Sequence, residues 1–114
     1  MRFAPFFLLV ATLSLPAYPH HGWSEYDSGN TLNLTGVIKE AGYEHPHGHV
    51  RLETPQKTWS VVLAPPSRME RRGLSQTQLK PGSRVTVVGY ANRNKPEEMR
   101  AERIIVNEKT VELR

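Results

Sequence analysis

The sequence predicts an all-β protein: a small barrel like those that bind oligonucleotides and oligosaccharides (OB-like), with five to six strands and one short helix between strands three and four. Apolar and polar residues alternate over several short stretches, which is the period of a half-buried strand. Glycine and proline separate these stretches, and a helix signal follows the third one. The same element order also fits a six-stranded open barrel or a small sandwich.

The first 17 residues have the organisation of a secretory signal peptide. Arg2 supplies positive charge, residues 3–15 form an almost uninterrupted apolar run, and Ala17 provides a small residue for cleavage. The run is too short to cross a bilayer as a helix. We therefore expect cleavage after Ala17 and export without a membrane anchor. The alternative is an amino-terminal helix retained in the fold.

Composition limits what the rest of the chain can be. We expect residues 18–30 to be a flexible amino-terminal segment and residues 31–114 to form one barrel domain, a length that suits a single core. The chain has no cysteine, which excludes a lipid anchor, disulfides and thiolate metal sites. The net charge of +4 is mild and its signs are interleaved, so we expect no nucleic-acid partner.

The first predicted strand spans Thr31–Glu40. Its alternation places Leu32, Leu34 and Ile38 on one face. Gly36 occupies a position on that face where a larger apolar residue would continue the pattern, so we expect a bulge or a sharp bend there. Such a bend suits a strand that curls around a small barrel.

Two further strands, at 49–53 and 58–64, are expected to form a hairpin around a turn at 54–57. Their predicted inward residues are Val50, Leu52, Trp59, Val61 and Leu63. Ser67 and Glu70 then match a capping box, which predicts a short helix that runs to Arg72 and stops at Gly73.

The remaining segments complete the barrel. Leu74 and Leu79 are expected to pack the connection after the helix onto the core. Strands follow at 84–90 and 99–106, and 110–113 adds a short final strand. In an OB-like barrel, the loops between strands one and two and between strands four and five flank the ligand face. Here these are the loops at 41–48 and 91–98.

All five histidines fall in two clusters, and imidazole is the commonest transition-metal ligand. His20 and His21 come just after the expected cleavage site, and His45, His47 and His49 follow the first predicted strand. In an extended chain the side chains of this second cluster would share a face at a spacing of about 7 Å. The sequence therefore predicts a metal site on the barrel rim, for which His47 and the His20-His21 pair are the strongest candidates and His45 and His49 are supporting ones.

Several of these motifs resemble a family of small exported bacterial proteins of unknown function, which begin the mature chain with His-His and carry Asn-Pro-His after the first strand. The residues that carry the resemblance are His20-His21, Tyr26-Asp27, Leu34-Thr35-Gly36-Val37, Pro46-His47, Trp59, Pro66, Arg71-Arg72-Gly73-Leu74, Leu79-Lys80-Pro81-Gly82 and Val85-Thr86-Val87. The resemblance covers nearly the whole mature chain and implies a periplasmic address and a β-barrel. His45 stands where the family has asparagine.

An all-nitrogen ligand set without thiolates suits Cu(II), Zn(II) or Ni(II). Export favours copper among these metals. Met69 and Met99 are distant in sequence from the histidines, which argues against a thioether-rich Cu(I) carrier. Glu44, beside His45, is a further oxygen ligand or a hydrogen-bond acceptor for an imidazole.

The alternative is that these histidines are solvated loop residues and that the protein is a metal-free periplasmic interaction module, which binds a protein or a glycan at the barrel rim. An enzyme is the least favoured interpretation, because no nucleophile motif or carboxylate pair accompanies the histidines. Arg68, Arg71 and Arg72 form a local basic patch that suits an anionic partner, although a solvated helix face explains it more simply.

Overall fold

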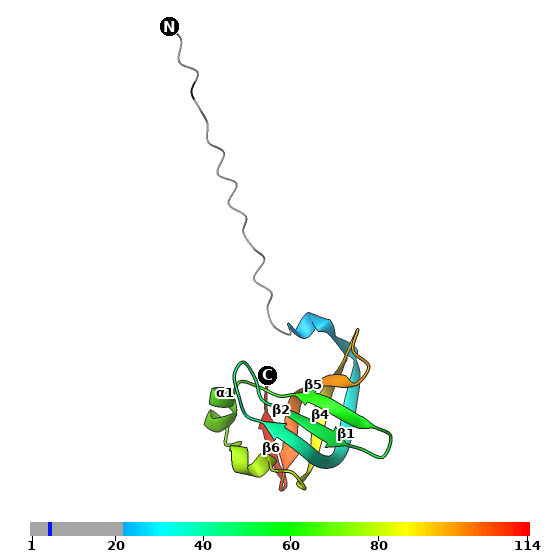
Figure 1. The fold of residues 1–114 in the computed structure, drawn as a ribbon, viewed down its shortest axis with the longest axis vertical. Coiled ribbons are helices and arrows are strands. Elements are labelled where there is room, and N and C mark those ends of the chain that lie inside the picture. Colours follow the sequence, from blue (N-terminus) through cyan, green and yellow to red (C-terminus); the bar gives the residue numbers. More distant parts are fainter. Residues whose placement is uncertain (1–4, 6–21) are drawn as a thin grey trace.

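Six strands form one curled sheet, in which the third and fifth strands along the chain also pair with each other (Figure 1). The computed structural model describes Pro5 and residues 22–114. The predicted cleavage site and both His20 and His21 lie outside these residues. The elements, in chain order, are η1 (Trp23–Glu25), β1 (Tyr26–Gly42), β2 (His49–Glu53), β3 (Thr58–Val62), α1 (Pro66–Arg71), η2 (Gln76–Leu79), β4 (Arg84–Asn92), β5 (Glu98–Val106) and β6 (Lys109–Glu112).

The sheet order is β3-β2-β1-β4-β5-β6, and all of these neighbours are antiparallel. A parallel pairing of β3 with β5 closes the ring. The predicted architecture is therefore confirmed, with six strands and one short α-helix between β3 and β4.

β1 belongs to both halves of this barrel. Its first part pairs with β4 as far as Val37, and its last part pairs with β2 from Val37 onwards. Where the partner changes, a Cβ added at Gly36 would overlap the carbonyl oxygen of Glu53. The predicted curl is confirmed, but the bulge lies after Gly36, between Ile38 and Glu40. Gly36 is required because another backbone passes too close for a side chain.

The core lies inside the ring. Of the predicted inward residues, Ile38, Val50, Leu52, Val61 and Leu63 are buried, whereas Leu32, Leu34 and Trp59 are partly buried against the same core. Leu74 and Leu79 are also buried, as predicted, so the connection from α1 through η2 covers one open part of the barrel. Within residues 22–114, no helix is long and apolar enough to cross a membrane.

The predicted start of the helix is wrong. α1 begins at Pro66, one residue before Ser67, and no side chain caps it. Proline suits the first helical position because its missing N–H would have no partner there, so the helix can start without a capping box. The capping box forms instead at η2, between Ser75 and Gln78. Gly73 ends the helical segment with a φ of 86°, as expected.

The close approach at Gly36 gives a stability prediction. We expect Gly36→Ala to lower the free energy of unfolding by about 2 kcal/mol or more, because β1 and β2 must separate to admit the methyl group. Urea unfolding followed by circular dichroism measures this.

Gly29→Ala is a matched control in the same strand. An added Cβ there meets only the Asp27 side chain, at 3.4 Å, and we expect a change within about 0.5 kcal/mol. Equal losses for the two variants would contradict the close-approach argument.

Candidate functional site

An aromatic and cationic cluster fastens the start of the described chain to the barrel. The Arg100 and Arg114 guanidinium carbons lie over the Trp23 ring, 4.2 and 4.6 Å from its centroid. Tyr90 meets the indole edge-on at 6.2 Å, and Tyr26 lies at 6.4 Å. Cations over an indole face are attracted by its quadrupole. We call these five residues the Trp23 cluster.

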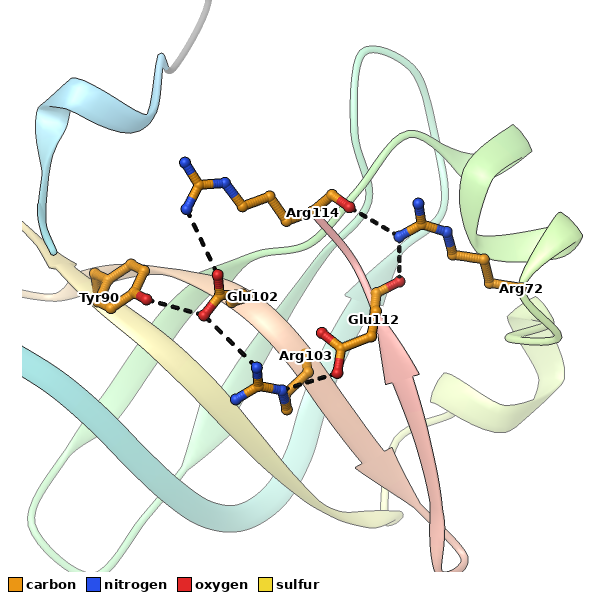
Figure 2. A network of polar contacts seen from close by, with 6 residues as sticks. All are labelled: Arg72, Tyr90, Glu102, Arg103, Glu112 and Arg114. Carbon is orange, nitrogen blue, oxygen red and sulfur yellow. Dashed lines mark hydrogen bonds and ion pairs between the residues drawn. The ribbon is translucent and has the colours of Figure 1, made fainter.

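Two carboxylates of β5 support this cluster. Glu98 accepts hydrogen bonds from the Tyr26 hydroxyl at 2.8 Å and from the Asn92 amide at 2.9 Å. Glu102 accepts one from the Tyr90 hydroxyl at 2.9 Å and forms an ion pair with Arg114 at 3.5 Å (Figure 2). The carboxylates therefore orient both tyrosines, and Glu102 also offsets part of the charge of Arg114.

A register shift in β5 makes room for this arrangement. Ala101 pairs with Gly89 and Arg103 with Val88, so Glu102 is the extra residue of a bulge. A Cβ at Gly89 would overlap the Arg100 carbonyl, which explains glycine on the facing strand. The bulge lets the side chains of both Glu102 and Arg103 point away from the core. Outside the core they form an ion pair at 3.8 Å.

Two arginines of the basic patch bind the end of the chain. Arg68 donates to the Leu113 carbonyl at 3.0 Å. Arg72 donates to the Glu112 and Arg114 carbonyls at 2.7 and 2.9 Å (Figure 2). The patch is therefore not simply a solvated helix face, because it ties α1 to the segment that follows β6.

Ionisation reflects these surroundings. Burial lowers the pKa of Arg100, and repulsion from Arg68 and Arg114 adds to this effect. Burial, followed by the hydrogen bond to Glu98, raises the pKa of Tyr26. The hydrogen bond to Glu102 raises the pKa of Tyr90. Both phenols are therefore held in the neutral form that donates to a carboxylate.

The second histidine cluster lies in and beside the loop at 43–48. His47 is half-buried with both ring nitrogens covered, whereas His45 and His49 are exposed. Only His49 lies in a strand, so the extended geometry expected for the three side chains does not extend through His45 and His47. The peptide bond between His45 and Pro46 is cis.

This loop is fastened to the α1 side of the barrel. Gly48 donates to the Ala64 carbonyl and accepts from the Leu63 amide, each at 2.8 Å. The Tyr43 hydroxyl donates to the Leu74 carbonyl at 2.6 Å. The position of His47 is therefore set by contacts on both sides of the loop.

The loop at 43–48 and η1 lie at one end of the barrel (Figure 1). Arg114 connects η1 to the end of the chain, and Arg68 connects that end to α1, against which the loop rests. Gly22, the residue that follows His21 in the sequence, is thus at the same end as His47.

Within residues 22–114, no group of three histidine, aspartate or glutamate side chains is arranged to hold a metal ion. A metal site built on His47 therefore needs ligands from outside the described residues. The His20-His21 pair directly precedes Gly22, where the described range 22–114 begins. The metal site remains a prediction.

The Trp23 cluster was not predicted from the sequence. Its members come from η1, β1, β4, β5 and the last residue of the chain. The sequence held a partial signal for it. Glu98, Arg100 and Glu102 are spaced two residues apart at the start of the predicted strand 99–106, which puts charges of both signs on one face of that strand.

The tyrosine hydrogen bonds predict a loss of stability at high pH. Because the folded protein holds these phenolic protons more tightly than the unfolded chain, which ionises near pH 10, the unfolding free energy should fall as pH rises above about 10. Tyr26→Phe should reduce this fall and cost about 1 kcal/mol at neutral pH.

Urea unfolding at a series of pH values, with absorbance titration of the phenols, measures both effects. Tyr90→Phe is the control, and its effects should be smaller because Tyr90 is only half-buried, whereas Tyr26 is 1% exposed. If the unfolding free energy of Tyr26→Phe falls above about pH 10 as steeply as that of the natural protein, the proposed contribution of this phenol is excluded.

Comparison with known proteins gives a family and a fold. No curated protein matches the chain. Among solved structures, the crystal structure of TiaS in complex with tRNA and ATP is similar with a TM-score of 0.53 and 20% sequence identity, over 78% of this chain. The chain spans only 20% of that structure's chain, so the similarity concerns the barrel fold alone. Residues 8–99 match DUF6152, a family of unknown function, and the protein belongs to this family.

Proposed function

We propose that this protein is an exported binding protein for a transition metal, with Cu(II) as the preferred ion. In this proposal, His47 and the His20-His21 pair are the main ligands, and His45 or His49 completes the coordination. The protein binds the ion without catalysing a reaction.

The observation that carries this proposal is the position of Trp23. Contacts with Arg100 and Arg114 fasten Trp23 at the barrel end that also carries the loop of His47. His20 is three residues before Trp23, so the chain limits its separation from the Trp23 backbone to about 11 Å. The tether thus supports a meeting of the two histidine clusters.

The chemistry of the ligands supports the choice of metal. Neutral imidazoles without thiolates suit Cu(II), Zn(II) and Ni(II), and an exported location favours copper. The contacts of its loop orient His47, whose ring nitrogens are covered by protein atoms, so binding requires one of these nitrogens to be uncovered. Glu102 offsets the charge of Arg114, which would otherwise repel a dication.

Export has its own test. When the full chain is expressed in a bacterium, we expect the periplasmic fraction to contain a product that begins at Tyr18, because the signal is removed after Ala17. Mass spectrometry of the fractions measures this. An uncleaved chain confined to the cytoplasm would contradict the proposed address.

Metal binding is tested by titration of the exported protein with Cu(II), Zn(II) and Ni(II) in a calorimeter. Cu(II) should bind most tightly. Replacing His20, His21 and His47 with alanine should weaken its affinity by at least about tenfold, because these changes remove ligands. The control is the double variant His45→Ala and His49→Ala, which should lose much less.

Two further variants separate ligation from folding. His20→Ala with His21→Ala leaves the barrel residues intact and should still weaken binding. Trp23→Ala should weaken binding while all five histidines remain, because it releases the tether. If the triple variant and the natural protein bind equally weakly, the metal proposal is excluded.

The second candidate is a metal-free interaction module that binds a protein or a glycan at the barrel rim. A groove beside β1 favours it, because that groove needs no metal to bind a partner.

A further inference from the structure

A groove follows the outer edge of β1, between that strand and η2. It encloses about 410 Å³, which lies within the range of about 300–1,000 Å³ for binding pockets. Its apolar surface comes from Ala41, Tyr43 and Pro81, which lie above the buried Leu79. A neighbouring hollow of about 270 Å³ shares Thr77 and Lys80 with the groove. The two hollows therefore form one continuous surface.

The strand edge beside the groove lacks a strand partner. β2 covers one edge of β1 up to Gly42, but on the other edge the pairing with β4 ends at Val37. Ile38 then bonds to the backbones of Ser83 and Gly82. From 39 to 42, no described strand covers this edge. After the bulge at Lys39, residues 40–42 pair regularly with β2, and because backbone groups alternate in direction along an antiparallel strand, some of those at 40–42 point away from β2.

The two hollows are lined by charge of one sign, and the strand segment beside them carries Lys39 and Glu40, which have opposite signs. The charged residues that line the two hollows are Lys80 and Arg84, and no carboxylate lines either of them. Within residues 22–114, neither side chain forms an ion pair or a hydrogen bond. An anionic group could therefore pair with Lys80 and Arg84 without breaking other interactions of these side chains.

We propose that this groove binds an extended acidic peptide segment of a partner protein, which adds to the open edge of β1 as a further strand. Main-chain hydrogen bonds to residues 39–42 supply affinity, as in other cases of strand addition. Apolar side chains of the segment pack over Tyr43 and Pro81, and its carboxylates reach Lys80 and Arg84. A glycan lacks the backbone groups that pair with a strand edge, so the peptide is the better match.

This inference goes beyond metal binding and does not depend on it, so the test is done with a chelator present. The probes are three labelled hexapeptides in which valine alternates with glutamate, glutamine or lysine. The glutamate peptide should bind several-fold more tightly than the glutamine peptide, and the lysine peptide most weakly, in fluorescence anisotropy. Equal binding of all three would overturn the proposal.

Charge reversal at one residue locates the binding. Lys80→Glu should weaken the glutamate peptide several-fold and strengthen the lysine peptide. Lys95→Glu is the matched control, because Lys95 is also exposed but lies in the loop between β4 and β5. If the two variants weaken the glutamate peptide equally, only net charge matters and the groove is excluded.

Occupation of the groove is tested by two further measurements. Gln76→Trp, at an exposed lining position, should fill the groove and abolish binding without unfolding the barrel. Amide hydrogen exchange should show new protection at residues 39–42 when the glutamate peptide binds. Protection at other residues instead would overturn the proposal. A dimer that is seen in sedimentation and is dissociated by Gln76→Trp would also overturn it, because the groove would then bind a second copy of the chain.

Discussion

The sharing of β1 between two partner strands is the constraint on which the rest of the structure depends. A single strand of 17 residues pairs with β4 along its first part and with β2 along its last part, so the sheet must curl. The curl brings β3 beside β5, which closes the barrel and encloses the core. It also leaves the last part of β1 with one open edge. The closed core and the open edge therefore have the same geometric cause.

The fold was predictable from the sequence because its main signals are local. Alternation at 49–53 and 58–64 identified the inward residues, since the period of a strand directly reports which face is buried. The start of β1 was missed because Tyr26–Asn30 carries no alternation and is paired only through contact with a distant strand. The start of α1 was misplaced because Pro66 occupies the first helical position, so Ser67 lies inside the helix and does not cap it.

The candidate site was only partly predictable, for a different reason. Histidine clusters can be found by composition and spacing, so His47 and the His20-His21 pair could be named from the sequence. The Trp23 cluster could not be found in this way, because it joins positions 23, 26, 90, 100 and 114 through contacts that exist only after the barrel has closed. The bulge at Glu102, which turns that carboxylate toward Tyr90, depends on pairing across two strands and has no local signal.

Tyr43 connects the two surfaces for which binding is proposed. Its ring lines the groove beside β1, and its position begins the loop that carries His47. Its hydroxyl is bonded to the Leu74 carbonyl, and burial raises the pKa of this phenol, so the donor stays protonated at neutral pH. This hydrogen bond contributes to the shape of both the loop and the groove, together with the backbone hydrogen bonds of Gly48 in the loop. The groove therefore does not have to be ordered by its ligand, and this preorganisation lowers the entropic cost of the peptide binding proposed there.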